Sequence, residues 1–369
     1  MTNRERQHAI FHYEAYDRLP AVHFGWWSET LEKWCAEGHL TREEITECYD
    51  GTEKDKTVGG KLGFDYNYYT VTGGLRDLYP YFEGATVREF PDGSKHLRNA
   101  DGAIVLWKPD ANGIPAEIGH TLVDRESWEE HYLPRLRWSD DRVAGRWLDA
   151  IKCEDDPLGL HCGSLFGRMR DWMGVEGVSY LLADDEELYD EIVQTLADLQ
   201  YAVVEKVLAS GRKFDFAHFW EDIAFRTGPL INPAVFEEKI GPQYKRFTAL
   251  CARYGIDIVS VDCDGAPDSL IPTWLNNGVN TMFPIEVGVW DGSFAPWREK
   301  YGKALRGVGG MDKRVFARDY AAVDREMERL KPIVELGGYI PCPDHRIPPD
   351  AVWENVQYYC ERFRRVFGG

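Results

Sequence analysis

The sequence lacks long apolar runs, closely paired cysteines and an excess of basic residues. No stretch approaches the ~18 consecutive apolar residues of a membrane helix, and no apolar segment follows the polar start, so we expect neither a membrane protein nor a secretory leader. The eight cysteines include no Cys-x-x-Cys pair, which favours reduced thiols in the cytoplasm. With 62 acidic and 43 basic residues the net charge is -19, which argues against nucleic-acid binding.

Nucleotide-binding loops are missing as well. The chain has neither a G-x-G-x-x-G nor a Walker sequence, and Ser164 has no G-x-S-x-G context. Aromatic rings, by contrast, are abundant: they make up 13% of the residues, with 13 Trp. This abundance favours a ring-lined pocket for a small molecule in addition to a core. The length of 369 residues fits either two domains or one α/β barrel.

Segments typical of strands and helices alternate along the chain. We expect eight strands, near residues 22, 65, 160, 216, 258, 281, 306 and 340. Helical patterns lie between many of them, such as the apolar residues spaced by three or four from Leu188 to Val207. Repeated strand–helix units imply a parallel sheet. Eight such strands predict a TIM (β/α)8 barrel, forming a single domain over residues 1–369.

Residues from about 76 to 120 interrupt this alternation. Two Asp-Gly pairs, Asp92-Gly93 and Asp101-Gly102, separate segments of alternating polarity, which is typical of β-hairpins. We therefore expect an antiparallel β-hairpin insertion after the second strand, at the barrel end where loops build active sites. The pattern leaves open whether this insertion contributes to a site or only packs against the barrel.

Acidic side chains follow five of the predicted strands. These carboxylates are Glu221, Asp222, Asp262, Asp264, Glu286, Asp312 and Asp344. Because the carboxyl ends of barrel strands meet at one mouth, we expect the side chains to converge there. They cannot all ionise cheaply at close range, so some must pair with Lys or Arg, keep a proton or bind a cation. For each single carboxylate, bracing a loop is the alternative to catalysis.

Both an acid–base site and a metal site fit this pattern. The predicted catalytic residues are Glu221, Asp262, Asp264 and His345. A thiolate, an imidazole and carboxylates suit Zn²⁺, and the predicted metal ligands are Asp262, Cys263, Asp264 and His345. The predicted substrate-binding residues are His23, Trp26, Trp27, Tyr68 and Glu286. A place in the core is the alternative for His23.

Several short segments resemble the uroporphyrinogen decarboxylase superfamily. They are Thr2-Asn3-Arg4-Glu5-Arg6, residues 16–20, Trp220-Glu221-Asp222, residues 228–231, Asp264-Gly265 and Ile347-Pro348-Pro349. The resemblance covers essentially the whole chain apart from the insertion, and it implies a TIM barrel. It also implies one of two activities. One is decarboxylation of uroporphyrinogen; the other is methyl transfer between a thiol or folate and a corrinoid carried by a separate protein.

The decarboxylase branch of this superfamily carries an Arg-Gln-Ala-Gly-Arg motif whose arginines hold the substrate carboxylates. Residues 22–29 of this chain contain no arginine, so the motif is absent. Because an octacarboxylate needs cationic clamps, the resemblance favours a cobalamin-dependent methyltransferase. A decarboxylase acting on a tetrapyrrole or a smaller carboxylate is the alternative, and a barrel that only binds a ligand is a third.

The zinc motif of the thiol-using methyltransferases is altered too. Those enzymes hold zinc with His-x-Cys-Gly and with a cysteine before Ile-Pro-Pro, and the corresponding residues here are Asp262, Asp264 and His345. Carboxylates activate a thiol less well than softer ligands do. A folate acceptor, or a methylated amine or aryl ether as donor, therefore fits better than a thiol. The chain has no D-x-H-x-x-G corrinoid signature, so the corrinoid is expected on a partner protein.

Overall fold

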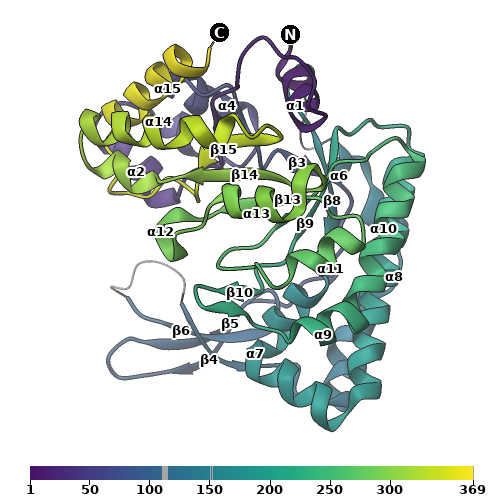
Figure 1. The fold of residues 1–369 in the computed structure, drawn as a ribbon. Helices are drawn as coiled ribbons and strands as arrows, with labels where there is room; N and C mark the ends of the chain where they lie inside the picture. The colour runs from purple at the N-terminus through teal and green to yellow at the C-terminus, as the bar shows by residue number, and fades with distance from the viewer. Residues whose placement is uncertain (110–114, 150, 152, 369) are drawn as a thin grey trace.

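The computed structural model describes residues 1–109, 115–149, 151 and 153–368. It is an α/β protein built on a seven-stranded sheet in the order β15-β14-β13-β12-β9-β8-β3 (Figure 1). All neighbouring strands of this sheet run parallel. The strands are β3 (Val71–Thr72), β8 (Gly159–Gly163), β9 (Phe216–Trp220), β12 (Val259–Asp262), β13 (Thr281–Ile285), β14 (Arg306–Met311) and β15 (Tyr339–Pro343).

A separate pair of parallel strands lies next to both edges of the seven-stranded sheet. β1 (Val22–His23) pairs with β2 (Tyr66–Asn67), which leads directly into β3. Beyond β1, Trp26 forms a parallel bridge with Ile347, which follows β15, and the Ile347 N–H donates to the Gly25 carbonyl at 3.1 Å. The eight strands predicted from the sequence are therefore present, and their order in space follows their order along the chain.

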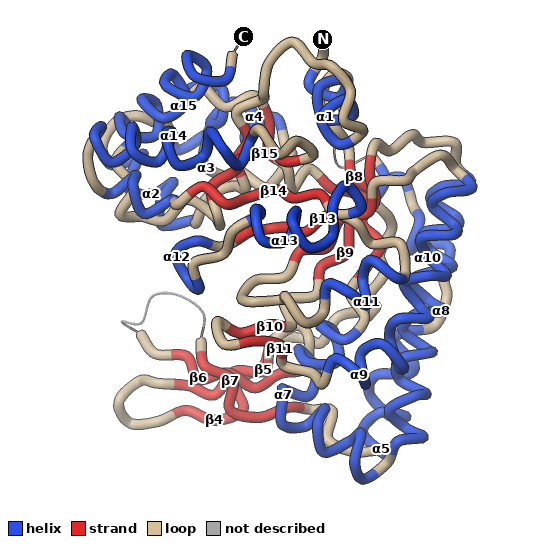
Figure 2. Tube along the Cα trace, viewed as in Figure 1, coloured by secondary structure: helices blue, strands red, loops and turns tan. Residues whose placement is uncertain are grey.

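Helices cover the outside of the sheet (Figure 2). The α-helices are α1 (Asn3–Phe11), α2 (Ser28–Ala36), α3 (Arg42–Ile45), α4 (Glu53–Leu62), α5 (Arg125–Ser127), α6 (Gly145–Leu148), α7 (Phe166–Asp184), α8 (Glu186–Ala209), α9 (Pro233–Val235), α10 (Gly241–Arg253), α11 (Ile271–Asn276), α12 (Val287–Trp290), α13 (Phe294–Tyr301), α14 (Tyr320–Val334) and α15 (Trp353–Phe367). The predicted helix over 188–207 is α8. The Asp185 carboxylate accepts the Leu188 N–H and so caps its first turn. Among the described residues, no helix has the length and apolarity needed to span a membrane.

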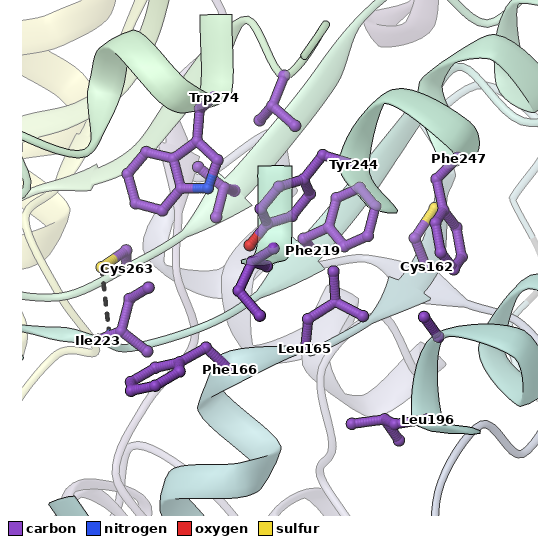
Figure 3. Close-up of a cluster of buried hydrophobic side chains, with 14 of the residues drawn as sticks. Cys162, Leu165, Phe166, Leu196, Phe219, Ile223, Tyr244, Phe247, Cys263 and Trp274 are labelled. Carbon is purple, nitrogen blue, oxygen red and sulfur yellow. Dashed lines mark hydrogen bonds between the residues drawn. The ribbon is translucent and has the colours of Figure 1, made fainter. Parts of the chain in front are cut away.

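The two faces of the strands pack against different neighbours, as alternating side chains require. Phe219 on β9 packs with Tyr244 and Phe247 of α10, within the core layer between sheet and helices (Figure 3). Phe216 on the same strand points the other way and stacks on Tyr68 with ring centroids 5.2 Å apart. Phe216 and Tyr68 therefore lie beneath the carboxyl ends of the strands, and we call this pair the aromatic floor.

The predicted insertion is a four-stranded antiparallel sheet in the order β4-β5-β6-β7. Its strands are β4 (Ala85–Glu89), β5 (Lys95–Arg98), β6 (Ala103–Trp107) and β7 (Ala116–His120). Gly93 and Gly102, the glycines of the two Asp-Gly pairs, have φ values of +81° and +86°, which L side chains disfavour. They sit between β4 and β5 and between β5 and β6, as the turn pattern predicts. A shorter pair, β10 (Ala224–Phe225) with β11 (Gly228–Pro229), follows β9.

Candidate functional site

Four acidic residues meet at the carboxyl ends of β9, β12 and β13, and we call Asp222, Asp262, Asp264 and Glu286 the carboxylate group. Asp262 ends β12 and is only 4% exposed. Among the described residues, its carboxyl has no hydrogen-bond or ion-pair partner. Burial raises its pKa well above the ordinary value, and the nearby charges of Asp264 and Asp222 raise it further. Burial thus favours the neutral form of Asp262.

Glu286 follows β13 and is the second proton holder of the carboxylate group. Burial, and then the charge of Asp264, raise its pKa to about 7, whereas His345 and Lys313 act in the opposite direction. The Gly265 N–H donates to Glu286 Oε2 at 2.7 Å and fixes the carboxyl against the turn after β12. Near neutral pH, Glu286 therefore exchanges a proton readily.

His345 joins this group from the loop after β15. Its Nε2 lies 3.3 Å from Asp264 Oδ2, while Asp264 Oδ1 is buried without a hydrogen-bond partner in the described part of the chain. The Trp27 ring stacks on the imidazole, with centroids 5.9 Å apart. The neighbouring Asp344 has a bracing role instead, because its carboxylate accepts the N–H groups of Val287, Gly288 and Lys313.

Glu221 does not join the carboxylate group, contrary to the expectation that it forms part of the polar centre. It is 0% exposed, and its Oε1 accepts the Leu165 N–H at 2.9 Å and the Tyr244 hydroxyl at 2.6 Å. Its Oε2 accepts the Gly167 N–H at 2.8 Å. These bonds hold the chain where α7 begins. We infer that Glu221 stabilises this loop rather than contacting a substrate.

Cys263 likewise lies apart from the residues predicted to share a metal with it. Its sulfur accepts the Ile223 N–H at 3.4 Å, and it packs in the apolar core close to Trp274 (Figure 3). Burial raises the pKa of this thiol well above its usual value. Within residues 1–109, 115–149, 151 and 153–368, no three His, Cys, Asp or Glu side chains form a group suited to a metal. The predicted zinc set does not fit this geometry.

The predicted substrate-binding residues divide between the mouth and the core. Trp27 lies at the mouth beside His345, and Glu286 lies there too. His23 is buried on the side of α4, where it stacks on Trp26 at 4.3 Å and burial lowers its pKa to about 3. The Trp26 indole N–H donates to buried Asp55 at 3.0 Å, on the same side. Tyr68 is part of the aromatic floor. His23, Trp26 and Tyr68 are thus buried, at 1%, 6% and 1% exposed, and their contact with a substrate stays a prediction.

A cavity that the sequence did not reveal opens beside the carboxylate group, and we call it the arginine cavity. Its volume is about 260 Å³, just below the ~300 Å³ at which pockets for drug-sized ligands begin. The lining residues are Tyr69, Leu75, Arg76, Asp77, Tyr81, His161, Gly163, Ser164, Arg168, Gln200 and Trp220. Arg76 follows β3 at the start of the insertion, so its position after a strand was the available sequence signal.

Tyr69 links the arginine cavity to the carboxylate group. Its ring lies 5.1 Å from that of His218, whose pKa burial lowers to about 3. The Arg346 guanidinium lies 5.9 Å from the Tyr69 ring and is paired with Asp50 at 2.6 Å and 3.1 Å. Burial raises the pKa of Tyr69, and the charge of Asp262 raises it further. Tyr69 thus lies between the arginine cavity and the carboxylate group, close enough for both to act on it.

Comparison with known proteins places this architecture among solved folds. No protein-family model matches the chain, and no curated protein matches it. A solved methyltransferase from Methanosarcina mazei aligns over 99% of both chains with a TM-score of 0.61 and 14% identity. A putative vitamin-B12 independent methionine synthase from Listeria monocytogenes aligns over 96% of this chain and 98% of its own, with a TM-score of 0.42 and 12% identity. The first likeness shows a shared fold.

Proposed function

We propose that the chain is a single-domain (β/α)8-barrel enzyme that moves a methyl group between a small substrate and a corrinoid on a partner protein. The order of the parallel strands and the bridge between Trp26 and Ile347 support closure of the sheet into a barrel. The whole-chain likeness to the Methanosarcina mazei methyltransferase supports the activity. Polar groups at the strand ends agree with the place where barrel enzymes keep their sites.

The observation that carries the proposal is a pair of carboxyl groups buried at neighbouring strand ends, Asp262 and Glu286, whose pKa values burial raises. When a methyl group leaves a heteroatom, the carbon–heteroatom bond breaks and its electron pair stays on the heteroatom. The acceptor supplies the electron pair of the new bond. A proton given to the heteroatom makes it a better leaving group. Asp262 and Glu286 are the proton donors for this step.

The same protonation states favour one class of methyl donor. A protonated carboxyl attracts a quaternary ammonium group less than a carboxylate does. A methyl ether oxygen, by contrast, needs the proton when its methyl group leaves. We therefore rank methyl ethers above methylamines. His345, set against Asp264 and Trp27, positions the reacting end. The corrinoid supplies the methyl acceptor when the partner protein docks, and no step is assigned to zinc.

Decarboxylation of a small acid is the second candidate, because the arginine cavity offers a cation for a carboxylate. Both candidates are tested by incubating the protein with methyl ethers, methylamines or carboxylic acids, with and without reduced cobalamin. The cobalamin spectrum reports methyl transfer, and released carbon dioxide reports decarboxylation. We expect a spectral change with at least one methyl ether. Carbon dioxide without any spectral change would overturn methyl transfer.

A further inference from the structure

We propose that the arginine cavity binds a carboxylate of the substrate through Arg76, so that the substrate is a small organic acid with its methylated group at the opposite end. As a statement about substrate class, this rests on the proposed function. As a statement about an anion site, it stands on the cavity alone.

Arg76 is the cation of the cavity whose charge has no partner. Among the described residues it forms no ion pair with a carboxylate, and its Nε is buried without a hydrogen-bond partner. Its Nη1 donates to the Gly74 carbonyl, which satisfies a proton but does not balance the charge. Burial lowers the pKa of this guanidinium, since nothing stabilises the charge fully. A bound carboxylate supplies the missing counter-ion in the planar, two-point geometry that arginine prefers.

The second arginine of the cavity shows the contrasting, satisfied state. Arg168 Nε lies 2.6 Å from Asp77 Oδ2, and its Nη1 lies 3.0 Å from Asp171 and 3.6 Å from Asp101. Asp77 is the carboxylate among the described residues that line the cavity, and Arg168 already holds it. The cavity therefore contains a paired arginine and an unpaired one. An anion is attracted to Arg76 without having to displace a protein carboxylate.

Neutral hydrogen-bond donors of the cavity complete the anion site. His161 Nδ1 accepts the Gly163 N–H at 3.0 Å, so the neutral ring carries its proton on Nε2. Burial and the charge of Arg76 lower the pKa of His161 well below its usual value, which keeps the ring neutral. The ring thus adds a donor without adding a charge. Tyr81 and Ser164 line the same cavity, and the Ser164 hydroxyl donates to Glu221 Oε2 at 3.4 Å.

The relation between the two parts of the site defines the substrate class. One part offers an uncompensated cation and neutral donors, and the other offers acids that hold protons. Tyr69 lines the arginine cavity, and the charge of Asp262 acts on its hydroxyl, so this residue lies between the two parts. A molecule that fills both places its carboxylate at Arg76 and its methylated heteroatom near Asp262 and Glu286. The Arg76 end then fixes the orientation of the heteroatom, which raises the effective concentration of the reacting groups.

The test measures binding, so it does not depend on methyl transfer. Benzoate, the isosteric neutral benzamide, and inorganic phosphate are titrated into the wild-type protein and into Arg76→Gln and Arg76→Lys by calorimetry. Benzoate is expected to bind on the order of 10- to 100-fold more tightly than benzamide, as a charge-assisted hydrogen bond implies. Arg76→Gln abolishes this preference, and Arg76→Lys keeps part of it. Arg42→Gln, at an exposed guanidinium, is the matched control and leaves the preference intact.

Equal affinity for benzoate and benzamide in the wild-type protein overturns the inference, and so does unchanged benzoate binding in Arg76→Gln. Tighter binding of phosphate than of benzoate overturns the carboxylate in favour of a phosphorylated ligand. If benzoate binding depends on Arg76 while every methyl donor fails to change the cobalamin spectrum, the anion site stands and the proposed function fails. The opposite pair of results leaves the function standing and removes Arg76 from substrate recognition.

Discussion

The carboxylate group and the arginine cavity both bury charged side chains at neighbouring strand ends, yet they relieve the cost of burial differently. Burial raises the pKa values of Asp262 and Glu286, which favours their neutral, protonated forms. A guanidinium cannot be neutralised in this way. Arg168 is instead surrounded by carboxylates, whereas Arg76 has no counter-ion in the described structure. The comparison shows that the acids are stable without a ligand, while Arg76 gains most from binding one.

The largest expected effect concerns Asp262 and Glu286, the two acids in this comparison. Asp262→Asn and Glu286→Gln remove a transferable proton but keep shape and neutrality, so kcat is expected to fall by about 10²- to 10⁴-fold. The folded state is expected to tolerate both changes, because burial already favours the neutral form of both side chains. Steady-state kinetics and thermal unfolding measure the two quantities. The control is Glu237→Gln, at an exposed glutamate. Unchanged kcat in both variants would contradict proton donation.

Glu221, whose carboxylate accepts several hydrogen bonds, should affect stability rather than proton transfer. Glu221→Ala leaves the N–H groups of Leu165 and Gly167 and the Tyr244 hydroxyl without their acceptor. We expect a loss of ~3 kcal/mol in unfolding free energy, because each buried orphan group costs ~1–3 kcal/mol. Urea denaturation measures it. A variant as stable as wild type but inactive would return Glu221 to the catalytic residues.

The strands were predictable from the sequence because apolar runs bounded by glycine and helix caps are local signals. The directions of side chains beyond the strand ends were not. Glu221 and Asp222 are adjacent, but Asp222 has a φ of +49°. Glu221 accepts the Gly167 N–H at the start of α7, whereas Asp222 accepts from Arg170 and lies within range of the charge of Asp264. Cys263 lies in the core because successive side chains alternate between the two faces of the chain. The role of Arg76 depends on a missing counter-ion, which is a property of the three-dimensional structure alone.

A third prediction compares the two arginines directly. Arg168→Gln leaves Asp77 without its 2.6 Å partner, and a loss of ~1–3 kcal/mol in unfolding free energy is expected because both groups are mostly buried. Arg76→Gln removes an unpaired charge, so the expected change is zero or a small gain in stability. Chemical denaturation of both variants without ligand measures the difference. Equal destabilisation would mean that Arg76 has a structural partner and would weaken the proposed anion site.

The smallest expected effect is a pH dependence of stability that Glu286 contributes. Its pKa rises from 4.5 in the unfolded chain to about 7 in the folded protein. Between these two values the folded state holds more protons, so the unfolding free energy falls as the pH increases and levels off above about 7. Glu286→Gln removes this contribution and flattens the profile. Urea unfolding at several pH values measures both slopes. Identical slopes would show that Glu286 is ionised in the folded protein, and the carboxylate group would then carry a charge that needs a cation, as the arginine cavity needs an anion.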